Sequence, residues 1–592
     1  MNTIQATQSA AQFQHNNLSL KIKNLLKTVE TVTKNLKLQS VAKNSQKRKL
    51  VISTNWLNLF LFSEGASVTE TVIGPKQGLA IKLASIGDEE TKKKVYARNY
   101  KNRDRETQID IRHQRKIDEA FGDAKEVHIT FSKGNLKIIP IFEHKHNIVH
   151  EGLDINLKND DGLYFGIIEA LDVIRNKAFS SITVDVDKDF SEAHENTLFC
   201  MQLRRMGYQI STNNNGQLSA KLTNIIPAHK NTLKTKSRSE SGVNSNTDVT
   251  INKETPLSTF VACTAGVDIE SIESEGFVTH SILETRPVEK RDIKKVKCKL
   301  TGKTYEIHSD KTETGAINAG INAKCPVSIF NEDIYKFKIS RVASAIGKNN
   351  FLHLSLQCSD FSGLKNKEDR ARAVEELTST RDMIFPALSI ISATRAPTLL
   401  IENVKNFSSS IECKLFEAQL EKLGYTITKS VLKGVDFNGY TQRERCYIFA
   451  TLLNTKPEAN FSFPKPVKRT AHLWNDIIAP NLHMLRDVSH TKTVAKAITS
   501  GRLRVINVGD EYSPTITKSQ SRQVKDSVYI LMNGHYFMPS NDMIKMMMGI
   551  EKYDTSLLSA EMSTECLGQS IEGKMHRKIS ESIKTHILAY CD

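Results

Sequence analysis

Three polar stretches between residues 351 and 449 decide how this chain is interpreted. Residues 356–362 read Leu-Gln-Cys-Ser-Asp-Phe-Ser, residues 402–407 read Glu-Asn-Val-Lys-Asn-Phe, and residues 441–447 read Thr-Gln-Arg-Glu-Arg-Cys-Tyr. The first two follow apolar runs typical of buried strands, and the third leads into another such run. Open parallel sheets build their sites where the carboxyl ends of their strands meet. The sequence therefore predicts that a thiol, a carboxylate and two guanidinium groups lie at one edge of a sheet.

Strand-like and helix-like patterns alternate on both sides of this stretch. We expect strands at residues 259–263, 278–283, 327–330, 351–356, 398–401, 425–432 and 447–452, and helices at residues 374–393 and 412–423. Repeated β-α alternation predicts an α/β fold with a doubly wound, mostly parallel, Rossmann-like sheet. The alternation breaks at residues 456–545, which predicts an inserted domain, and it resumes with helices at residues 541–548 and from Glu572 onward.

The composition is that of a soluble globular protein with several domains. The 592 residues exceed one ordinary domain, and 39% hydrophobic with 25% charged residues suits well-formed cores. A formal net charge of +16 favours a polyanionic partner such as nucleic acid. The longest apolar stretch, residues 383–393, is too short to span a bilayer, and no charged-then-apolar leader opens the chain. We therefore expect a cytoplasmic protein that associates with DNA and not with a membrane.

The first fifty residues combine a basic composition with a periodic apolar pattern. They carry nine Lys and Arg residues against Glu30 alone, which fits either a solvated face or an arm that contacts phosphates. Apolar residues recur in steps of four and three from Leu18 to Leu36, which predicts a helix with an a/d seam. This seam could pair with a second copy of the chain, giving self-association, or pack on the chain's own body.

Composition and pattern divide the chain into seven segments. After the basic arm comes a β-rich module and then an α/β module, and together they form an α+β accessory region without a recognisable cluster of reactive residues. A linker rich in Ser, Thr, Asn and Lys precedes the main α/β domain, its insertion and its return. The segments are residues 1–50, 51–145, 146–225, 226–256, 257–455, 456–545 and 546–592. Short β runs of the accessory region are expected at residues 56–62, 78–83, 126–131 and 136–142.

Residues at the ends of the first three strands of the main domain indicate a nucleoside cofactor. A turn containing Gly266 lets a ligand approach the backbone, and Glu284 at the tip of the second strand can accept both ribose hydroxyls. Asp333 at the tip of the third strand could accept a hydrogen bond from an adenine amino group. Cys263 and Ala265 stand where glycines would be expected in such a turn.

Taken together, these clusters resemble the C5-cytosine DNA methyltransferases in order and in spacing. The residues that carry the resemblance are Cys358-x-x-Phe361-Ser362, Glu402-Asn403-Val404 and Arg443-x-Arg445. It covers about residues 256–592 and places the target-recognition region of that family at residues 456–545. Residues 567–571 resemble the closing motif, which completes the cofactor pocket. The resemblance implies a class I methyltransferase-like fold, S-adenosylmethionine as the cofactor and duplex DNA as the partner.

The resemblance also implies a role for each polar residue. Cys358 is the nucleophile, and its thiolate adds to C6 of cytosine so that C5 can attack a methyl group. Glu402 lies at the N3 edge of the base, and Asn403 shapes that loop. Arg445, with Arg443, contacts the base O2 or an adjacent phosphate. The implied cofactor-binding residues are Val261, Gly266, Glu284, Asp333, Ile334 and Ser570.

The function implied is methylation of cytosine at C5 within a short specific sequence of duplex DNA. A stacked base cannot react, so the cytosine must be flipped into the pocket, while residues 456–545 read the major groove. After transfer the C5 proton leaves and the thiol is eliminated, so no metal ion is required. The nine cysteines contain no C-x-x-C pair, so no zinc knuckle is indicated either.

The sequence departs from the family pattern at several positions, among them Ser359 after the nucleophile and Thr441 where Gln is expected, and two alternative functions stay open. Gln357 stands where Pro usually precedes the nucleophile, and Gly266 is the one glycine retained in the cofactor turn. One alternative is an RNA C5-cytosine methyltransferase that uses the same Cys and Glu. The other is a DNA-binding protein with a decayed catalytic core, which would form no trapped adduct on DNA containing 5-fluorocytosine.

Overall fold

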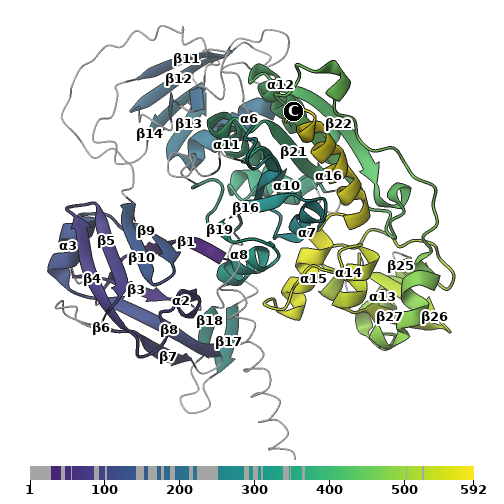
Figure 1. Ribbon diagram of the computed structural model, residues 1–592, viewed down its shortest axis with the longest axis horizontal. Coiled ribbons are helices and arrows are strands. Elements are labelled where there is room, and N and C mark those ends of the chain that lie inside the picture. The colour runs from purple at the N-terminus through teal and green to yellow at the C-terminus, as the bar shows by residue number, and fades with distance from the viewer. Residues whose placement is uncertain are drawn as a thin grey trace, which may run out of the picture. The chain divides into compact units, whose positions relative to one another are not determined.

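A computed structural model of the chain describes two compact units (Figure 1). Unit 1 comprises Met1–Glu143, Val278–Asp333 and Asp554–Leu558, and unit 2 comprises His144–Phe277, Ile334–Tyr553 and Ser559–Asp592. The residues described within these bounds are 29–41, 47–54, 56–85, 93–100, 103–141, 152–157, 170–171, 173–174, 179–186, 194–212, 218–222, 251–285, 293–297, 304–308, 311–337, 346, 349–362, 367–501, 503–522 and 526–591.

The main sheet of unit 2 has the strand order β22-β23-β21-β20-β15. Its strands are β15 (Ser258–Ala262), β20 (Phe351–Ser355), β21 (Thr398–Val404), β22 (Thr426–Lys433) and β23 (Glu444–Thr451). Strands β15, β20 and β21 are parallel neighbours, whereas β23 runs antiparallel to β21 and β22. The parallel strands are buried along almost their whole length, as expected for a sheet that is covered on both faces. The predicted α/β fold with a parallel core is confirmed.

The helices that accompany these strands are α7 (Val267–Ser274), α10 (Lys367–Glu375), α11 (Ile384–Thr394), α12 (Ile411–Lys422), α14 (Asn541–Met547), α15 (Ala560–Gln569) and α16 (Gly573–Leu588). The helices expected at residues 412–423 and 541–548 and from Glu572 onward lie close to their expected positions, but the single helix expected at residues 374–393 is wrong, because α10 ends at Glu375 and α11 begins at Ile384. The last helix packs against α7, and its apolar residue at every fourth position is fully buried: Met575, Ile579, Ile583 and Ile587. Arg577 on α16 forms an ion pair of 3.0 Å with Glu270 on α7.

The inserted residues contain a small sheet with its own core. Strands β24 (Leu485–Asp487), β27 (His535–Pro539), β26 (Val528–Met532) and β25 (Arg504–Asn507) pair in that order, beside helix α13 (Lys492–Thr499). The core residues of this sheet are Val488, Val494, Tyr529 and Met538. A separate core lets this region keep its shape without support from the main sheet.

Part of the accessory region also belongs to unit 2. Its four strands pair in the order β11 (Leu153–Leu157), β12 (Ser181–Val186), β14 (Leu218–Leu222) and β13 (Tyr208–Thr212), with helix α6 (His194–Arg205) before β13. Helix α6 is fixed to the main domain through the fully buried Asp382, which accepts hydrogen bonds of 2.8 Å from both Gln202 and Arg205.

Unit 1 is built on a larger, mainly antiparallel sheet. Its order is β16 (Val278–Leu283), β19 (Val327–Phe330), β1 (Val29–Lys37), β9 (Glu126–Ser132), β10 (Asn135–Ile141), β5 (Gly78–Leu83), β4 (Ser67–Gly74) and β6 (Lys93–Lys94). A second sheet pairs β2 (Gln39–Ser40), β3 (Arg48–Ser53), β8 (Arg103–Ile111) and β7 (Tyr96–Tyr100), and a hairpin pairs β17 (Ile293–Lys297) with β18 (Thr304–His308). Its helices are α2 (Trp56–Leu59), α3 (Gln114–Phe121) and α8 (Lys311–Ile321).

Two predictions for the accessory region are wrong. Residues 29–37 form strand β1 and not the second half of a helix, and residues 18–28 lie outside the described part of the chain. Val32 and Leu36 are four residues apart, a spacing that also places two side chains on one face of a strand. The strand pairs with β19 on one side and β9 on the other, so this half of the predicted self-association seam lies inside a sheet. The run at residues 56–62, expected to be β, begins with helix α2 instead.

No helix in the described part of the chain is long and apolar enough to cross a membrane.

We expect β1 to be an essential interior strand of unit 1. Replacing the fully buried Val32 by Ala should lower the free energy of unfolding by about 1–3 kcal/mol, because it leaves a cavity between paired strands. Lys37→Ala is the matched control at the exposed end of the same strand, and it should change stability by less than about 0.5 kcal/mol. Urea unfolding measures both, and equal effects would contradict the interior position of β1.

Candidate active site

The predicted nucleophile lies in a tight turn directly after β20. Cys358 is half-buried, and its carbonyl oxygen accepts hydrogen bonds from the backbone N–H groups of Phe361 (3.1 Å) and Ser362 (3.0 Å). The N–H of Gln357 donates to the Met383 sulfur at 3.4 Å. A proline, the residue usual at position 357, lacks an N–H. The glutamine therefore adds a contact that fixes the start of the turn.

Both ends of this turn are fastened to the segment that follows β21. Asn403 donates from Nδ2 to the Leu356 carbonyl at 3.2 Å, and Asn406 donates to the Phe361 carbonyl at 3.1 Å. The rings of Phe361 and Phe407 pack edge to face with centroids 5.0 Å apart. Asn403 also accepts from the Val404 N–H at 2.8 Å, which locks its amide. The expected shaping role of Asn403 thus has a physical basis, since it holds the backbone two residues before the thiol.

Glu402 occupies the buried end of β21 and is held on both sides. Its Oε1 lies 2.6 Å from Nε of Arg445, and its Oε2 accepts from the Ser355 hydroxyl at 2.7 Å. Glu402 and Arg445 are only 4% and 7% exposed, so little solvent screens their ion pair. Strand pairing places Ser355 and Tyr447 directly opposite Glu402 on β20 and β23. The carboxylate is therefore fixed in one orientation beside the Cys358 turn.

Arg443 differs from its expected role. It is 1% exposed, and its two Nη atoms donate to the carbonyls of Ile516 (3.0 Å) and Gly568 (3.1 Å). Burial and the neighbouring Arg445 lower the pKa of Arg443 to about 9, while Glu402 and Cys358 act in the opposite direction. Its guanidinium is therefore committed to holding the inserted region and the end of α15 against β23, and it does not point to solvent for a phosphate. Arg445 is the arginine left for a substrate contact.

The turn after β15 keeps a glycine-like backbone even without the glycines. Cys263 and Ala265 have φ values of 63° and 55°, and Gly266 has 77°. Left-handed conformations at ordinary residues cost roughly 1 kcal/mol each, so the surrounding structure must impose them. One such restraint is the hydrogen bond of 2.9 Å from the Tyr553 hydroxyl to the Ala265 carbonyl. The turn thus keeps the left-handed backbone that glycine adopts without strain.

The other predicted cofactor residues fall in both units. In unit 2, Val261 is buried in β15, Ile334 is buried, and the buried Ser570 donates to the Leu567 carbonyl at 2.7 Å. In unit 1, Glu284 is buried directly after β16, and Asp333 is exposed three residues after β19. The structure therefore brings Cys358, Glu402, Asn403 and Arg445 together within unit 2, whereas Glu284 and Asp333 belong to unit 1.

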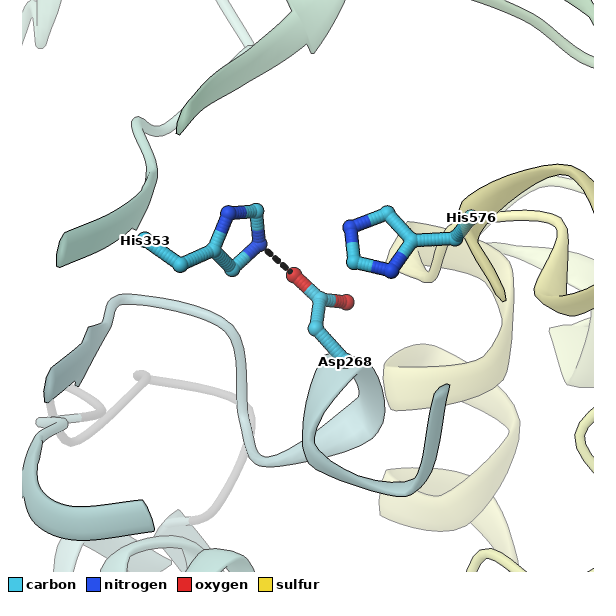
Figure 2. A group of neighbouring side chains, drawn as sticks. All are labelled: Asp268, His353 and His576. Atoms are coloured by element: carbon cyan, nitrogen blue, oxygen red, sulfur yellow. Dashed lines mark hydrogen bonds and ion pairs between the residues drawn. The ribbon is translucent and has the colours of Figure 1, made fainter. Parts of the chain in front are cut away.

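Several residues beside this site were not identified from the sequence. Ser355 and Asn406 lie next to identified residues but carry no distinctive spacing. Asp268, His353 and His576 form a compact buried group (Figure 2), and His353 belongs to the strand that leads to Cys358. A histidine in the middle of the apolar strand Phe351–Ser355 is the one sequence signal that could have indicated this group.

Comparisons with known proteins identify related sequences. Residues 320–582 match the family model for C-5 cytosine-specific DNA methylase. The chain is 33% identical over 112 residues to the type II methyltransferase M.HaeII of Haemophilus aegyptius, covering 18% of this chain and 34% of that protein. It is 28% identical over 178 residues to M.NgoBI of Neisseria gonorrhoeae, covering 28% of this chain and 55% of that protein. The chain thus spans between about a third and about half of the length of these two relatives.

Among solved structures, the Entamoeba histolytica methyltransferase EhMeth aligns with a TM-score of 0.40 and 14% identity, over 55% of this chain and 98% of that one.

We expect Asn403→Ala to loosen the Cys358 turn. Leaving the Leu356 carbonyl without its partner should cost about 1–3 kcal/mol of stability, and the released turn should raise the rate at which a maleimide alkylates Cys358. Asn454→Ala is the matched control, because Asn454 is exposed and donates to Thr426 outside the site. Mass spectrometry of the labelled peptide measures the rate. An unchanged rate of Cys358 alkylation in Asn403→Ala would contradict the restraint of this turn by Asn403.

The pH dependence of stability should report the fully buried Glu572, which caps α16. Burial raises its pKa from 4.5 to about 7. Below pH 4.5 both the folded and the unfolded chain bind the proton. Between pH 4.5 and 7 the carboxyl group releases its proton in the unfolded chain but keeps it in the folded chain, so the free energy of unfolding falls as the pH rises. Above pH 7 this loss of stability is constant.

The Met575 N–H donates to the Glu572 carboxyl at 2.8 Å. Glu572→Gln keeps an oxygen acceptor for this N–H and removes the titratable carboxyl group. The variant should therefore gain about 3 kcal/mol over the wild type at pH 8, and this gain should vanish near pH 4. Urea unfolding at the two pH values measures the difference. A gain that is the same at both would refute the raised pKa.

Proposed function

We propose that this chain methylates C5 of cytosine in duplex DNA at a short specific sequence, and the match of residues 320–582 to the family model for C-5 cytosine-specific DNA methylase supports this proposal. One observation carries the proposal. Asn403 and Asn406 fasten the Cys358 turn beside the buried pair of Glu402 and Arg445. That arrangement delivers a thiol, a carboxylate and a cation to one edge of the sheet, which is the set of groups that attack on a cytosine ring needs.

The chemistry follows from the weak nucleophilicity of C5. The Cys358 sulfur forms a bond to C6, and the displaced electron pair makes C5 an enamine carbon that can attack an electrophile. A proton shared between the Glu402 carboxyl and N3 offsets the negative charge that develops on the ring as C6 is attacked. S-adenosylmethionine supplies the electrophilic methyl group when it is bound. The C5 proton then leaves, and the bond between sulfur and C6 breaks to restore the ring and the free thiol.

Two buried guanidinium groups contribute differently to the site. Arg443 lies directly before β23, and Arg445 lies within it. Burial lowers the pKa of Arg443 to about 9, while Glu402 and Cys358 are among the groups that act in the opposite direction. Arg443 is assigned a positioning role, and Arg445 is assigned the contact with the base or a phosphate.

The residues after β15 fit a nucleoside cofactor. The backbone is left-handed at Cys263, Ala265 and Gly266, and Gly266 has no side chain to stand in the way of a ligand. We assign Val261, Gly266 and Ser570 of unit 2 to the binding of S-adenosylmethionine. The roles of Glu284, Asp333 and Ile334 stay predictions from the sequence.

Recognition of the DNA sequence is assigned to the inserted sheet. Its exposed basic residues, Arg486, Lys492, Lys496 and Lys518, suit contacts with phosphates. Its loops would then reach base edges in the major groove, while the target cytosine is flipped toward Cys358. The relatives are type II methyltransferases by name, and a modification role beside a restriction nuclease is the biological setting we propose.

The test is transfer of a labelled methyl group from S-adenosylmethionine to mixed-sequence duplex DNA. Wild type should label cytosine C5, and Cys358→Ser should lose at least about a thousandfold in rate, because a hydroxyl cannot replace the thiolate. Cys325→Ser is the control, since Cys325 is also half-buried and has no assigned role. Mapping the labelled cytosines then gives the recognised sequence.

Three outcomes would overturn the proposal. Label on tRNA and none on DNA would assign the RNA reaction instead. DNA binding without label or trapped adduct on 5-fluorocytosine DNA would assign a binding protein. Full activity in Cys358→Ser would show that Cys358 is not the nucleophile.

A further inference from the structure

Three buried side chains from distant parts of the chain lie close together. Asp268 lies in the first turn of α7, His353 in the middle of β20 and His576 near the start of α16 (Figure 2). Their exposed fractions are 2%, 0% and 0%. One potential ligand atom from each lies within 4.8 Å of the other two. Two imidazoles and a carboxylate in such a group form a donor set for a transition-metal ion.

The hydrogen bonds of the group leave nitrogen atoms without partners. Nε2 of His353 contacts Oδ2 of Asp268, and Nδ1 of His576 pairs with the Ser271 hydroxyl at 2.7 Å. Among the residues that the structure describes, Nε2 of His576 and Nδ1 of His353 have no hydrogen-bond partner. One ring nitrogen of His576 faces the His353 ring in Figure 2, and the ring centroids are 5.1 Å apart. A buried polar atom without a partner costs about 1–3 kcal/mol, so an occupant that bonds this nitrogen would stabilise the fold.

We propose that Asp268, His353 and His576 bind one divalent transition-metal ion, with Zn²⁺ the ion that best suits two imidazoles and one carboxylate. A water molecule would fill the fourth coordination position.

The ion fastens three elements and takes no part in the methyl transfer. Its ligands belong to the helix after the cofactor turn, to the strand that leads to Cys358, and to the last helix of the chain. A site closed to solvent by its own protein ligands is typical of structural metal ions. The proposal is independent of the substrate, so metal content tests it whether or not the chain methylates DNA.

The first test is the metal content of the full chain, purified without chelator and without a metal-affinity step. We expect about one Zn²⁺ per chain in the wild type and at least a fivefold loss in His576→Gln and in Asp268→Asn. The second variant keeps the shape of the side chain and the hydrogen bond to His353 while removing the charge. His586→Gln is the matched control, because His586 is buried on the same helix and pairs with Thr451 and Ala459 outside the group. It should retain the metal.

The second test needs no variant and separates this site from zinc held by any of the nine cysteines. X-ray absorption at the zinc edge should show nitrogen and oxygen ligands at ~2.0–2.1 Å and no sulfur at ~2.3 Å. Adding Zn²⁺ to chelator-treated protein should raise the melting temperature. A metal-free protein from zinc-supplemented cells with no such rise, sulfur ligands in the absorption spectrum, or full metal content in His576→Gln would each overturn the proposal.

Discussion

The parallel pairing of β20 with β15 on one side and β21 on the other is the constraint on which the site depends. Because all three strands run in the same direction, the cofactor turn, the Cys358 turn and Glu402 all lie at one edge of the sheet. The register of β20 and β21 places Ser355 opposite Glu402, so the serine can bond the carboxylate that Arg445 holds from β23. A shift of one residue would turn Glu402 to the other face and separate it from the thiol.

The sequence indicated which groups would meet, but it could not indicate how they would be held. Apolar runs that end in polar clusters predicted the strands and hence the proximity of Cys358, Glu402 and Arg445. The hydrogen-bond partners of a buried guanidinium group could not be predicted, since they depend on which carbonyl groups pack around it. Arg443 binds carbonyls 73 and 125 residues away, and no local pattern contains that information.

The fold was predictable where pattern and packing agree. Short runs bounded by turns, such as β16 and β19, were located to the residue, and the apolar residue at every fourth position of α16 was predicted correctly because one face of that helix is buried. Strand β1 shows why the spacing of apolar residues predicted the wrong element at residues 29–37. A spacing of four residues fits a helix and also one face of a strand. Residues 29–37 form a strand because they pair with β9 and β19, which lie about a hundred and about three hundred residues later in the sequence. Similarly, Cys263 and Ala265 adopt the glycine conformation because of packing around them.

The packing of α16 against α7 has a consequence for how the chain is made. Helix α7 leaves the ribosome about three hundred residues before the helix that covers it. At roughly 5–20 residues per second, translation leaves that face uncovered for on the order of 15–60 s. During this interval Asp268 and the apolar surface around it have no partner on α16. The face of α7 is therefore uncovered until α16 has been synthesised, and a ribosome that stalls before α16 releases a chain in which this face is still open.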